Sequence, residues 1–327
     1  MVTFPLGDDR PLRLAMLGMT EGNGHPYSWS IILNGHYDPD ALADCPYAVI
    51  RSYIARQPVE TLGIPGVEVT HVCCDDPADA EQVARVARIA NVVSRPEDVI
   101  GQVDAVIVAT DIGGEHVARA RPFVEAGLPV FIDKPLCDSR DDLRRFSRWI
   151  DAGRPILSSS AMRYAKEFAP YHRATHEFGR LRHVSMTMAK SWETYGIHAL
   201  EAIMPITGPG FETIRNTGDG ARNILHLRHR DGIDVTLAVI RDLSGGAGLL
   251  TLAGTEGGVQ LRSHDTYHAF AAQLRAAMAW MRSGVAPVPW AETRELMQLV
   301  IGGIESRARG GAEIALADIA ADTGADG

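Results

Sequence analysis

Short apolar runs alternate with amphipathic segments over the first half of the chain. The runs hold few polar residues, as expected for strands of a parallel sheet that is covered on both faces. The segments between them have apolar residues at helical spacing, and Pro26 and Gly127 suit a helix start and a helix end. We expect strands at 12–18, 67–73, 103–109 and 128–132, and helices at 26–33, 79–87, 116–126 and 138–150. This alternation predicts an α/β fold with a Rossmann-type, doubly wound parallel sheet.

The rhythm changes after about residue 156, where strand-like runs follow one another with short turns between them. Asp231 and Gly232 lie between two of these runs and are typical of a tight hairpin turn. We expect strands at 184–189, 223–229, 235–240 and 249–252, and helices at 167–178, 198–205, 267–282 and 290–309. The order predicts an α+β domain with an open, mostly antiparallel sheet, whose uncovered face can pack on a helix or on a second subunit.

The length of the chain also favours two domains, because 327 residues exceed what a single hydrophobic core usually serves. We place the parallel-sheet domain at residues 1–155 and the α+β domain at residues 156–317. Residues 318–327 are rich in alanine, aspartate and glycine, so we expect a frayed tail there.

Composition narrows the possible partners. The net charge is −9 and the chain has no block of basic residues, which argues against nucleic acid and against anionic membrane surfaces. No apolar run approaches the length of a membrane span, and the N-terminus has no cationic segment followed by an apolar stretch. The four cysteines show no metal-type spacing and suit a reducing compartment. We therefore expect a cytoplasmic protein.

The turn after the first predicted strand contains Gly18, Gly22 and Gly24. Glycines between a first strand and a first helix usually hold the pyrophosphate of a dinucleotide on backbone amides. Counted from Gly18, however, the second and third glycines of the usual fingerprint fall on Thr20 and Asn23. The position favours nucleotide binding, the spacing does not, and a tight loop without phosphate remains the alternative.

Two further strand ends offer candidate cofactor contacts. Asp75 follows the second predicted strand, where a carboxylate commonly binds the ribose hydroxyls of the adenosine half. Thr110 and His116 follow the third strand, at the edge of the sheet that faces a nucleotide. Asp75 also suits a simple turn, and His116 also suits packing at a helix start.

Lys134 directly follows the fourth apolar run and precedes Pro135. The chain has 32 basic residues, yet only Lys134, Lys166 and Lys190 are lysines. An ammonium is a compact proton donor whose pKa responds to burial, whereas a guanidinium keeps its proton. Proline fixes an extended backbone before it, so Pro135 directs how Lys134 leaves the strand. A solvated lysine at a strand end is the alternative reading.

A second polar segment runs from Lys190 to His198, where a strand of the second domain turns into a helix. A histidine at this helix start can exchange protons near neutral pH and lies close to any ligand between the domains. Taken singly, such a histidine is more often structural.

Taken together, these segments resemble the glucose-fructose oxidoreductase / inositol dehydrogenase / MocA (Gfo/Idh/MocA) family, over nearly the whole chain. Residues 131–135 are similar to the Glu-Lys-Pro motif of the family. The other matching strings are Arg163-Tyr164, Gly196-Ile197-His198, residues 254–258, and the C-terminal run through Ala291, Ser306 and Gly310.

The resemblance implies an NAD(P)-dependent enzyme that moves a hydride between nicotinamide and a hydroxyl or ketone of a sugar or cyclitol. Lys134 would bind the reacting oxygen, and His198 would bind it or exchange its proton. The implied cofactor contacts are Gly18, Thr20, Gly22, Asn23, Gly24, Asp75, Thr110, His116, Asp133 and Lys134. The implied substrate contacts are Arg163, Lys190, Trp192, Thr194, Tyr195 and His198. Trp192 suits the hydrophobic core equally well.

The resemblance further implies a small carbohydrate-like substrate, and we expect a homodimer or homotetramer formed through the open sheet. NAD is favoured over NADP because the carboxylate of Asp75 repels a 2′-phosphate, although Arg85 and Arg88 lie nearby in the sequence.

Departures from the family pattern keep a second hypothesis open. Asp133 replaces the usual glutamate, and Thr194 stands where many members have an aspartate. The glycine fingerprint is irregular as well. These changes lie around the cofactor site, so the alternative is a non-redox, ligand-binding relative of the same fold that has lost its cofactor.

Residues 36–66 form an insertion between the first predicted helix and the second strand, where a connection of a few residues would suffice. Its tyrosines and prolines suit a packed surface loop, and a lid or an interface is the alternative.

His172 and His176 have i, i+4 spacing on a predicted helix, so a zinc site is conceivable there. The segment is polar and lacks an evident third ligand, and we therefore predict no metal site.

Overall fold

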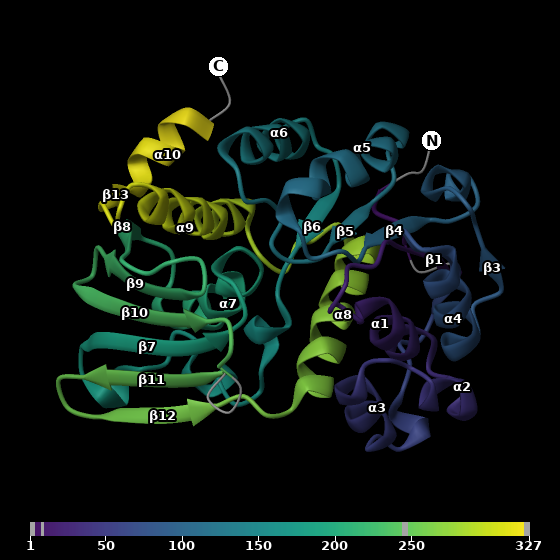
Figure 1. Cartoon of the computed structure of the whole chain (residues 1–327), viewed down its shortest axis with the longest axis horizontal. Helices are drawn as coiled ribbons and strands as arrows, with labels where there is room; N and C mark the ends of the chain where they lie inside the picture. Colours follow the sequence, from purple (N-terminus) through teal and green to yellow (C-terminus); the bar gives the residue numbers. More distant parts are fainter. Residues whose placement is uncertain (1–3, 8–9, 244–247, 324–327) are drawn as a thin grey trace.

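The computed structural model describes residues 4–7, 10–243 and 248–323, and Figure 1 shows two sheets side by side. The first sheet has the strand order β3-β2-β1-β4-β5-β6, and every neighbouring pair is parallel. Its strands are β1 (Leu12–Leu17), β2 (Val67–Cys73), β3 (Asn91–Val92), β4 (Ala105–Val108), β5 (Val130–Ile132) and β6 (Ile156–Ser158). The predicted Rossmann-type sheet is confirmed.

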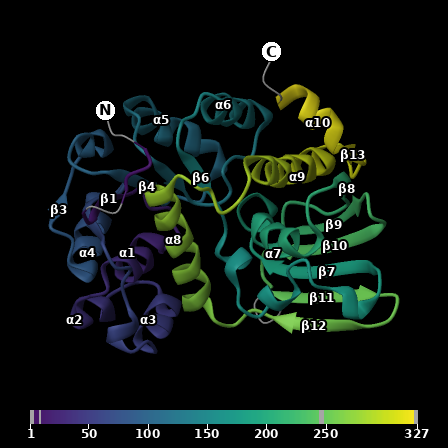
Figure 2. The same cartoon turned by 180° about the vertical axis from the view of Figure 1, so that it is seen from behind.

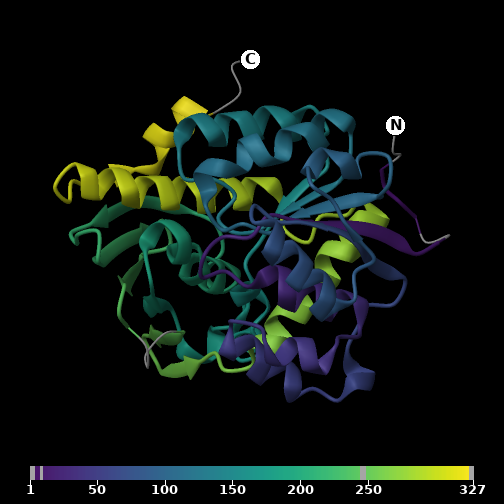
Figure 3. The same cartoon turned by 45° about the vertical axis from the view of Figure 1, so that its right-hand side comes forward.

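Helices cover both faces of this sheet (Figure 3). They are α1 (His25–Asn34), α4 (Pro77–Ala87), α5 (His116–Ala126) and α6 (Arg140–Asp151). Alternate residues of β1 point to opposite faces: Leu14 packs in the core with α1 and α4, and Ala15 in the core with α5 and α6. Side chains of Asp76 and Ser139 cap α4 and α6 by accepting backbone hydrogen bonds.

The second sheet has the order β12-β11-β7-β10-β9-β8-β13. Its strands are β7 (Leu181–Ala189), β8 (Phe211–Asn216), β9 (Arg222–His229), β10 (Ile233–Ile240), β11 (Leu249–Gly254), β12 (Gly258–Arg262) and β13 (Ile314–Ala315). Only β7 and β10 pair in parallel among the pairs described. The predicted α+β arrangement with a mostly antiparallel sheet is confirmed, as is the hairpin at Asp231 and Gly232.

One face of the second sheet packs on α7 (Ile197–Thr207) and α9 (Trp290–Ala308). Burial along β10 alternates residue by residue, so its other face is more open. Helix α8 (Thr266–Ser283) runs between the two sheets, as Figure 2 shows from behind. Its buried residues belong to the core of the first sheet, where α8 contacts α1. The predicted domain boundary near residue 155 stays a prediction.

The prediction of a helix over residues 167–178 is wrong. The segment holds two separate 3-10 turns, Ala169–Tyr171 and His176–Phe178. Pro170 lies inside the expected helix, where it removes a backbone donor, and Arg173 has a left-handed φ of 53°. His172 and His176 therefore do not share a helical face, and the spacing argument for a zinc site has no basis.

The insertion contains two short helices, α2 (Pro39–Ala43) and α3 (Ala48–Ala55), instead of a continuous loop. Helix α3 contacts both α1 and α8. Residues 318–323 of the predicted tail lie in helix α10 (Leu316–Thr323), and residues 324–327 lie outside the described residues. Within the described parts of the chain, the helices lack the combination of length and apolar composition needed to cross a bilayer.

Candidate active site

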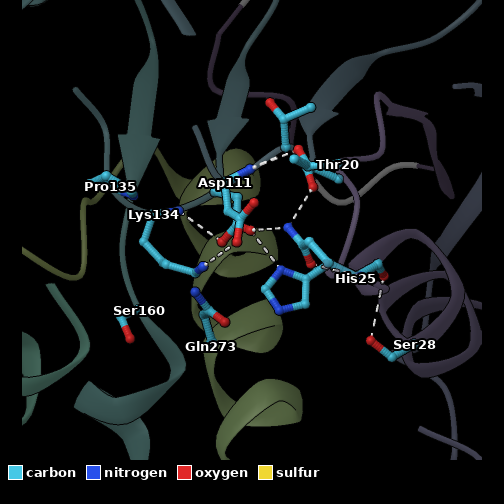
Figure 4. Close-up of polar contacts among 12 residues, drawn as sticks. Thr20, His25, Ser28, Asp111, Lys134, Pro135, Ser160 and Gln273 are labelled. Atoms are coloured by element: carbon cyan, nitrogen blue, oxygen red, sulfur yellow. Dashed lines mark hydrogen bonds and ion pairs between the residues drawn. The ribbon is translucent and has the colours of Figure 1, made fainter. Parts of the chain in front are cut away.

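Lys134 lies at the carboxyl end of β5 and is only 2% exposed. Its Nζ is 3.3 Å from Oδ2 of Asp111 and 5.1 Å from the centre of the Tyr195 ring. Figure 4 shows the ammonium pointing toward Asp111. Burial opposes the charge, but the carboxylates of Asp133 and Asp111 outweigh it and raise the pKa of Lys134. Lys134 is therefore a protonated hydrogen-bond donor.

Asp133 is wholly buried beside Lys134 and joins it to the start of α1. Its Oδ2 lies 2.6 Å from Nδ1 of His25 and accepts a hydrogen bond from Nδ2 of Asn23 at 3.2 Å. Its Oδ1 accepts the backbone N–H of Lys134. Burial favours the neutral acid, yet His25 and Lys134 lower the pKa of Asp133 to about 2. Asp133 is thus a buried carboxylate that hydrogen-bonds Asn23, His25 and the backbone of Lys134 and so holds them in place.

His198, in the first turn of α7, reaches the same region from the second domain. Its Nδ1 is 2.6 Å from Oγ of Ser160, and its ring meets the ring of Tyr195 edge-on at 4.7 Å between centroids. Burial, together with the charge of Lys134, lowers the pKa of His198 well below its ordinary value. His198 is therefore neutral at physiological pH.

Lys190 connects the second domain to the glycine turn of the first. Its Nζ donates to the backbone oxygen of Gly22 at 3.3 Å and lies 4.4 Å from the centre of the Tyr195 ring. Tyr195 therefore touches Lys134, Lys190 and His198. Three predicted site residues therefore surround the ring of a fourth, Tyr195.

Three predicted substrate residues are engaged elsewhere. Trp192 is wholly buried, and its indole nitrogen donates to the backbone oxygen of Val300 at 2.9 Å. It belongs to the core, which corrects its expected place at the substrate. The hydroxyl of Thr194 pairs with Ser191 at 2.9 Å.

The third of these residues, Arg163, forms ion pairs with Glu201 and, at 2.7 Å, with Glu292. Both partners are mostly buried, so this guanidinium is already neutralised inside the protein.

His116 and Thr110 lie beneath the surface of the sheet edge, and both are wholly buried. Nε2 of His116 is 3.0 Å from the backbone oxygen of Thr110, and Nδ1 is 2.9 Å from that of Pro135. His116 thus links the turns after β4 and β5. Its predicted contact with a cofactor is replaced by this internal role, because the side chain has no exposed surface.

A cavity of about 400 Å³ opens at the carboxyl edge of the first sheet, between Gly18, Asp75 and Phe123. Gly18 has φ +79°, and a Cβ there would lie 2.7 Å from Cγ2 of Thr110. Asp75 is half-exposed and accepts two hydrogen bonds from Arg119, at 2.9 and 3.1 Å. The cavity lies where a Rossmann sheet binds an adenosine, and the glycine and the carboxylate fit that group.

In the glycine turn, Gly22 has open space around it, whereas Gly24 is covered by other side chains. A Cβ on Gly22 would meet no atom within 4 Å, which leaves room for a phosphate. A Cβ on Gly24 would lie 2.5 Å from Ile50 and 2.6 Å from Tyr47, both from the insertion. The Tyr47 hydroxyl also shares a hydrogen bond with the backbone of Gly22. The residues present fit a dinucleotide, with the insertion beside its phosphates.

Sequence reasoning did not select three residues of this site: His25, Asp111 and Tyr47. His25 directly follows the glycine turn and Asp111 directly follows Thr110, so their positions at strand ends were the available signal. Tyr47 comes from the insertion, and no sequence pattern links it to the glycine turn.

Comparisons with known proteins agree with this fold. The family model GFO_IDH_MocA, described as an oxidoreductase family with an NAD-binding Rossmann fold, matches residues 47–153. A search of curated proteins found no match.

Among solved structures, myo-inositol 2-dehydrogenase from Lactobacillus plantarum superposes with a TM-score of 0.74 at 15% identity, covering 94% of this chain and 99% of that one. Scyllo-inositol dehydrogenase from Lactobacillus casei gives 0.73 at 12% identity, with coverages of 94% and 99%. An oxidoreductase from Agrobacterium radiobacter, in complex with NAD⁺, L-tartaric acid and magnesium, gives 0.71 at 15% identity, with the same coverages. At these identities the likeness shows the fold alone. The match of the family model over residues 47–153 confirms the predicted resemblance to the Gfo/Idh/MocA oxidoreductase family, with its NAD-binding Rossmann fold.

Proposed function

We propose that this protein is an NAD(P)-dependent oxidoreductase that transfers a hydride between nicotinamide and a hydroxyl or ketone of a sugar- or cyclitol-like molecule. One observation carries the proposal: Lys134 from the first domain and His198 from the second flank the same Tyr195 ring, at 5.1 and 4.7 Å. They meet at the sheet edge that holds the glycine turn and the adenosine-sized cavity. Two polar donors across a domain boundary suit the binding of one reacting oxygen.

In the proposed site Lys134 and His198 hydrogen-bond the reacting oxygen. Lys134 presents an ammonium, and neutral His198 presents a ring N–H. For reduction of a ketone, these two groups would stabilise the negative charge that develops on the oxygen. The polyol dehydrogenases with similar folds support the substrate class.

The cofactor would lie along the edge of the first sheet. Gly18 and Asp75 would hold the adenosine half, and the open face of Gly22 would hold the phosphates, with Thr20 and Asn23 in the same turn. When bound, the nicotinamide dinucleotide supplies the hydride or accepts it. Asp75 favours NAD over NADP because a carboxylate repels a 2′-phosphate, and the bidentate pair with Arg119 weakens that preference.

The test is a titration of the folded protein with NADH and, separately, NADPH, followed by nicotinamide fluorescence. We expect binding at micromolar concentrations. Gly18→Ala should abolish it, because the added methyl group collides with Thr110. Gly101→Ala is a matched control, since Gly101 has a similar φ of +85° and open space around it. Absence of binding by the wild-type protein would refute the proposal.

A specific observation favours one alternative, a non-redox relative that binds a ligand without a cofactor. Tyr47 and Ile50 cover Gly24, and Asp111 already neutralises Lys134. In such a protein, the pocket between the domains would bind a ligand in the absence of any dinucleotide.

We further propose a cytoplasmic homodimer or homotetramer acting on a small molecule. The four cysteines are free and buried, which suits a reducing compartment. The open face of the second sheet is the proposed contact surface, and sedimentation of the purified protein tests it.

A further inference from the structure

The two donors proposed to bind the reacting oxygen leave the site without a proton acceptor. Lys134 is an ammonium held by Asp111, so it has no free lone pair. Nδ1 of His198 is already paired with Oγ of Ser160 at 2.6 Å. Burial, together with the charge of Lys134, also lowers the pKa of His198 well below its ordinary value, which makes His198 a weak proton acceptor. Oxidation of an alcohol, however, releases a proton that some group must accept.

His25 has the opposite arrangement. Its Nδ1 lies 2.6 Å from Oδ2 of Asp133, which is a buried carboxylate and accepts hydrogen bonds only. Nδ1 must therefore carry the proton, and the lone pair of the neutral ring is on Nε2. Among the described residues, Nε2 has no hydrogen-bonding partner. Figure 4 shows one ring nitrogen of His25 toward the carboxylates and the other directed away from them.

The ring of His25 is held in a fixed orientation. It stacks on Trp29 with 4.5 Å between centroids and an interplanar angle of 15°, and it meets Phe270 of α8 edge-on at 5.0 Å. Its side chain keeps 15% exposure, in contrast to wholly buried Asp133. A histidine fixed on one side and exposed on the other has the geometry of a proton-transfer group.

The exposed side of His25 borders a cavity of about 230 Å³. The insertion supplies one wall with Tyr47 and Tyr53, and Tyr195 and Phe270 supply others. These rings offer flat apolar surfaces with few polar groups. The same cavity reaches Gly22, Asn23 and Gly24, so a ligand held at the glycine turn would lie beside His25.

We infer that His25, oriented by Asp133, is the proton acceptor of this site. The inference rests on the proposed function. The hydroxyl O–H bond breaks and its proton moves to Nε2 of His25. The adjacent C–H bond breaks with its electron pair leaving as hydride to the oxidised nicotinamide dinucleotide, and the carbon and oxygen form the carbonyl bond. Asp133 is a positioning residue.

Several charged or titratable groups face His25 from the surrounding elements. They are Asp133 and Lys134 from the end of β5, Asp111 behind Lys134, His198 from α7, Lys190 and Tyr195 from the second domain, and Tyr47 and Tyr53 from the insertion. Variants whose pH profiles are compared must therefore leave all of these residues unchanged.

The first test needs no turnover. In ¹⁵N-labelled protein, imidazole nitrogen shifts should show His25 in the Nδ1–H form when neutral. Asp133→Asn should change that tautomer, and Asp133→Glu, which keeps a carboxylate, should preserve it. A neutral His25 that carries its proton on Nε2 in the wild-type protein would overturn the inference.

The second test measures oxidation of myo-inositol, scyllo-inositol and glucose with NAD⁺ and NADP⁺. His25→Asn keeps a donor toward Asp133 and removes Nε2, so kcat should fall by about 10²–10⁴ with little change in NADH affinity. His226→Gln is the control, because His226 forms a 2.7 Å pair with Asp234 on the exposed second sheet.

The outcomes separate the two proposals. An active wild-type enzyme whose His25→Asn variant stays within about threefold of it would overturn this inference alone. A wild-type protein that oxidises none of these compounds and binds no dinucleotide would overturn the proposed function, and this inference with it.

Discussion

Arg119 on α5 binds the carboxylate of Asp75 at the end of β2 through two hydrogen bonds, of 2.9 and 3.1 Å. The pair lies on the wall of the adenosine-sized cavity, where a ribose hydroxyl or a 2′-phosphate would be recognised. Arg119 also pairs with Glu115 one turn earlier on the helix. A paired carboxylate and guanidinium therefore lie where NAD would be distinguished from NADP.

The first prediction concerns this pair. Arg119→Ala leaves Asp75 without its neutralising partner, so we expect NADPH affinity to fall relative to NADH affinity by roughly tenfold, equivalent to about 1.4 kcal/mol. Fluorescence titration with both dinucleotides measures the ratio. Arg121→Ala is the control, since Arg121 is exposed on the same helix. An unchanged ratio would show that Arg119 has no part in cofactor choice.

The second prediction concerns Lys134 and combines activity with stability. Lys134→Ala should abolish turnover, because the reacting oxygen loses a donor, while NADH affinity stays within about threefold. The same change leaves Asp111 and buried Asp133 without their cation, which should lower the free energy of unfolding by about 3–5 kcal/mol. Urea denaturation measures this loss, and adding Asp111→Asn should recover part of it. A fully active Lys134→Ala enzyme would disprove the proposed role of the ammonium.

The third prediction follows from the pKa of Asp133, which falls from an ordinary 3.8 to about 2 on folding. A carboxyl whose pKa is depressed in the folded protein stabilises it above the unfolded value, and that stability is lost as the pH falls through the folded value. The contribution is on the order of 2 kcal/mol. The loss should occur between about pH 4 and about pH 2.

Urea denaturation at several pH values tests this, with Asp133→Asn as the comparison. The stability difference between the wild-type protein and the variant should narrow as the pH falls through that window. A difference that stays constant down to about pH 2 would mean that Asp133 does not titrate there.

The fourth prediction addresses the insertion. The hydroxyl of Tyr47 forms a hydrogen bond with the backbone of Gly22, next to the open space proposed for the phosphates. Tyr47→Phe removes that hydroxyl and frees the backbone group, so NADH should bind roughly twofold to tenfold more tightly, by about 0.5–1.5 kcal/mol. Tyr37→Phe, elsewhere in the insertion, is the control. Weaker binding by Tyr47→Phe would instead make Tyr47 a contact of the cofactor.

The fold was predictable because its main signals are local. Strands of a parallel sheet that is buried on both faces are mostly apolar, so β4 and β5, which are apolar throughout, and β1, which has one polar residue, stand out. The elements that escaped detection lack such a signal. Strand β12 alternates between exposed and half-buried residues, and β13 has only two residues.

The candidate site was predictable only in part, because its pairs join residues that are distant in sequence. Lys134 and His198 came from short motifs. The contacts of His25 with Asp133 and of Lys134 with Asp111 depend on the order of the strands, which brings the ends of β1, β4 and β5 together. Trp192 shows the opposite error: a Cβ on Gly303 would lie 2.5 Å from its indole nitrogen, so a distant glycine makes room for it in the core.

The last prediction separates hydrogen bonding from proton exchange at His198. Its Nδ1 is hydrogen-bonded with Oγ of Ser160, and burial with the charge of Lys134 keeps the pKa of His198 well below its ordinary value. His198→Asn should therefore lower kcat by about 10- to 100-fold through loss of a donor, and it should leave the shape of the pH–rate profile between about pH 6 and about pH 8 unchanged. Ser160→Ala removes the hydrogen-bonding partner of Nδ1 and should reduce kcat by a smaller factor. Steady-state rates across this pH range measure both variants. If His198→Asn removed an ionisation from the profile in this range, His198 would titrate near neutral pH, and His25 would not be needed as the proton acceptor.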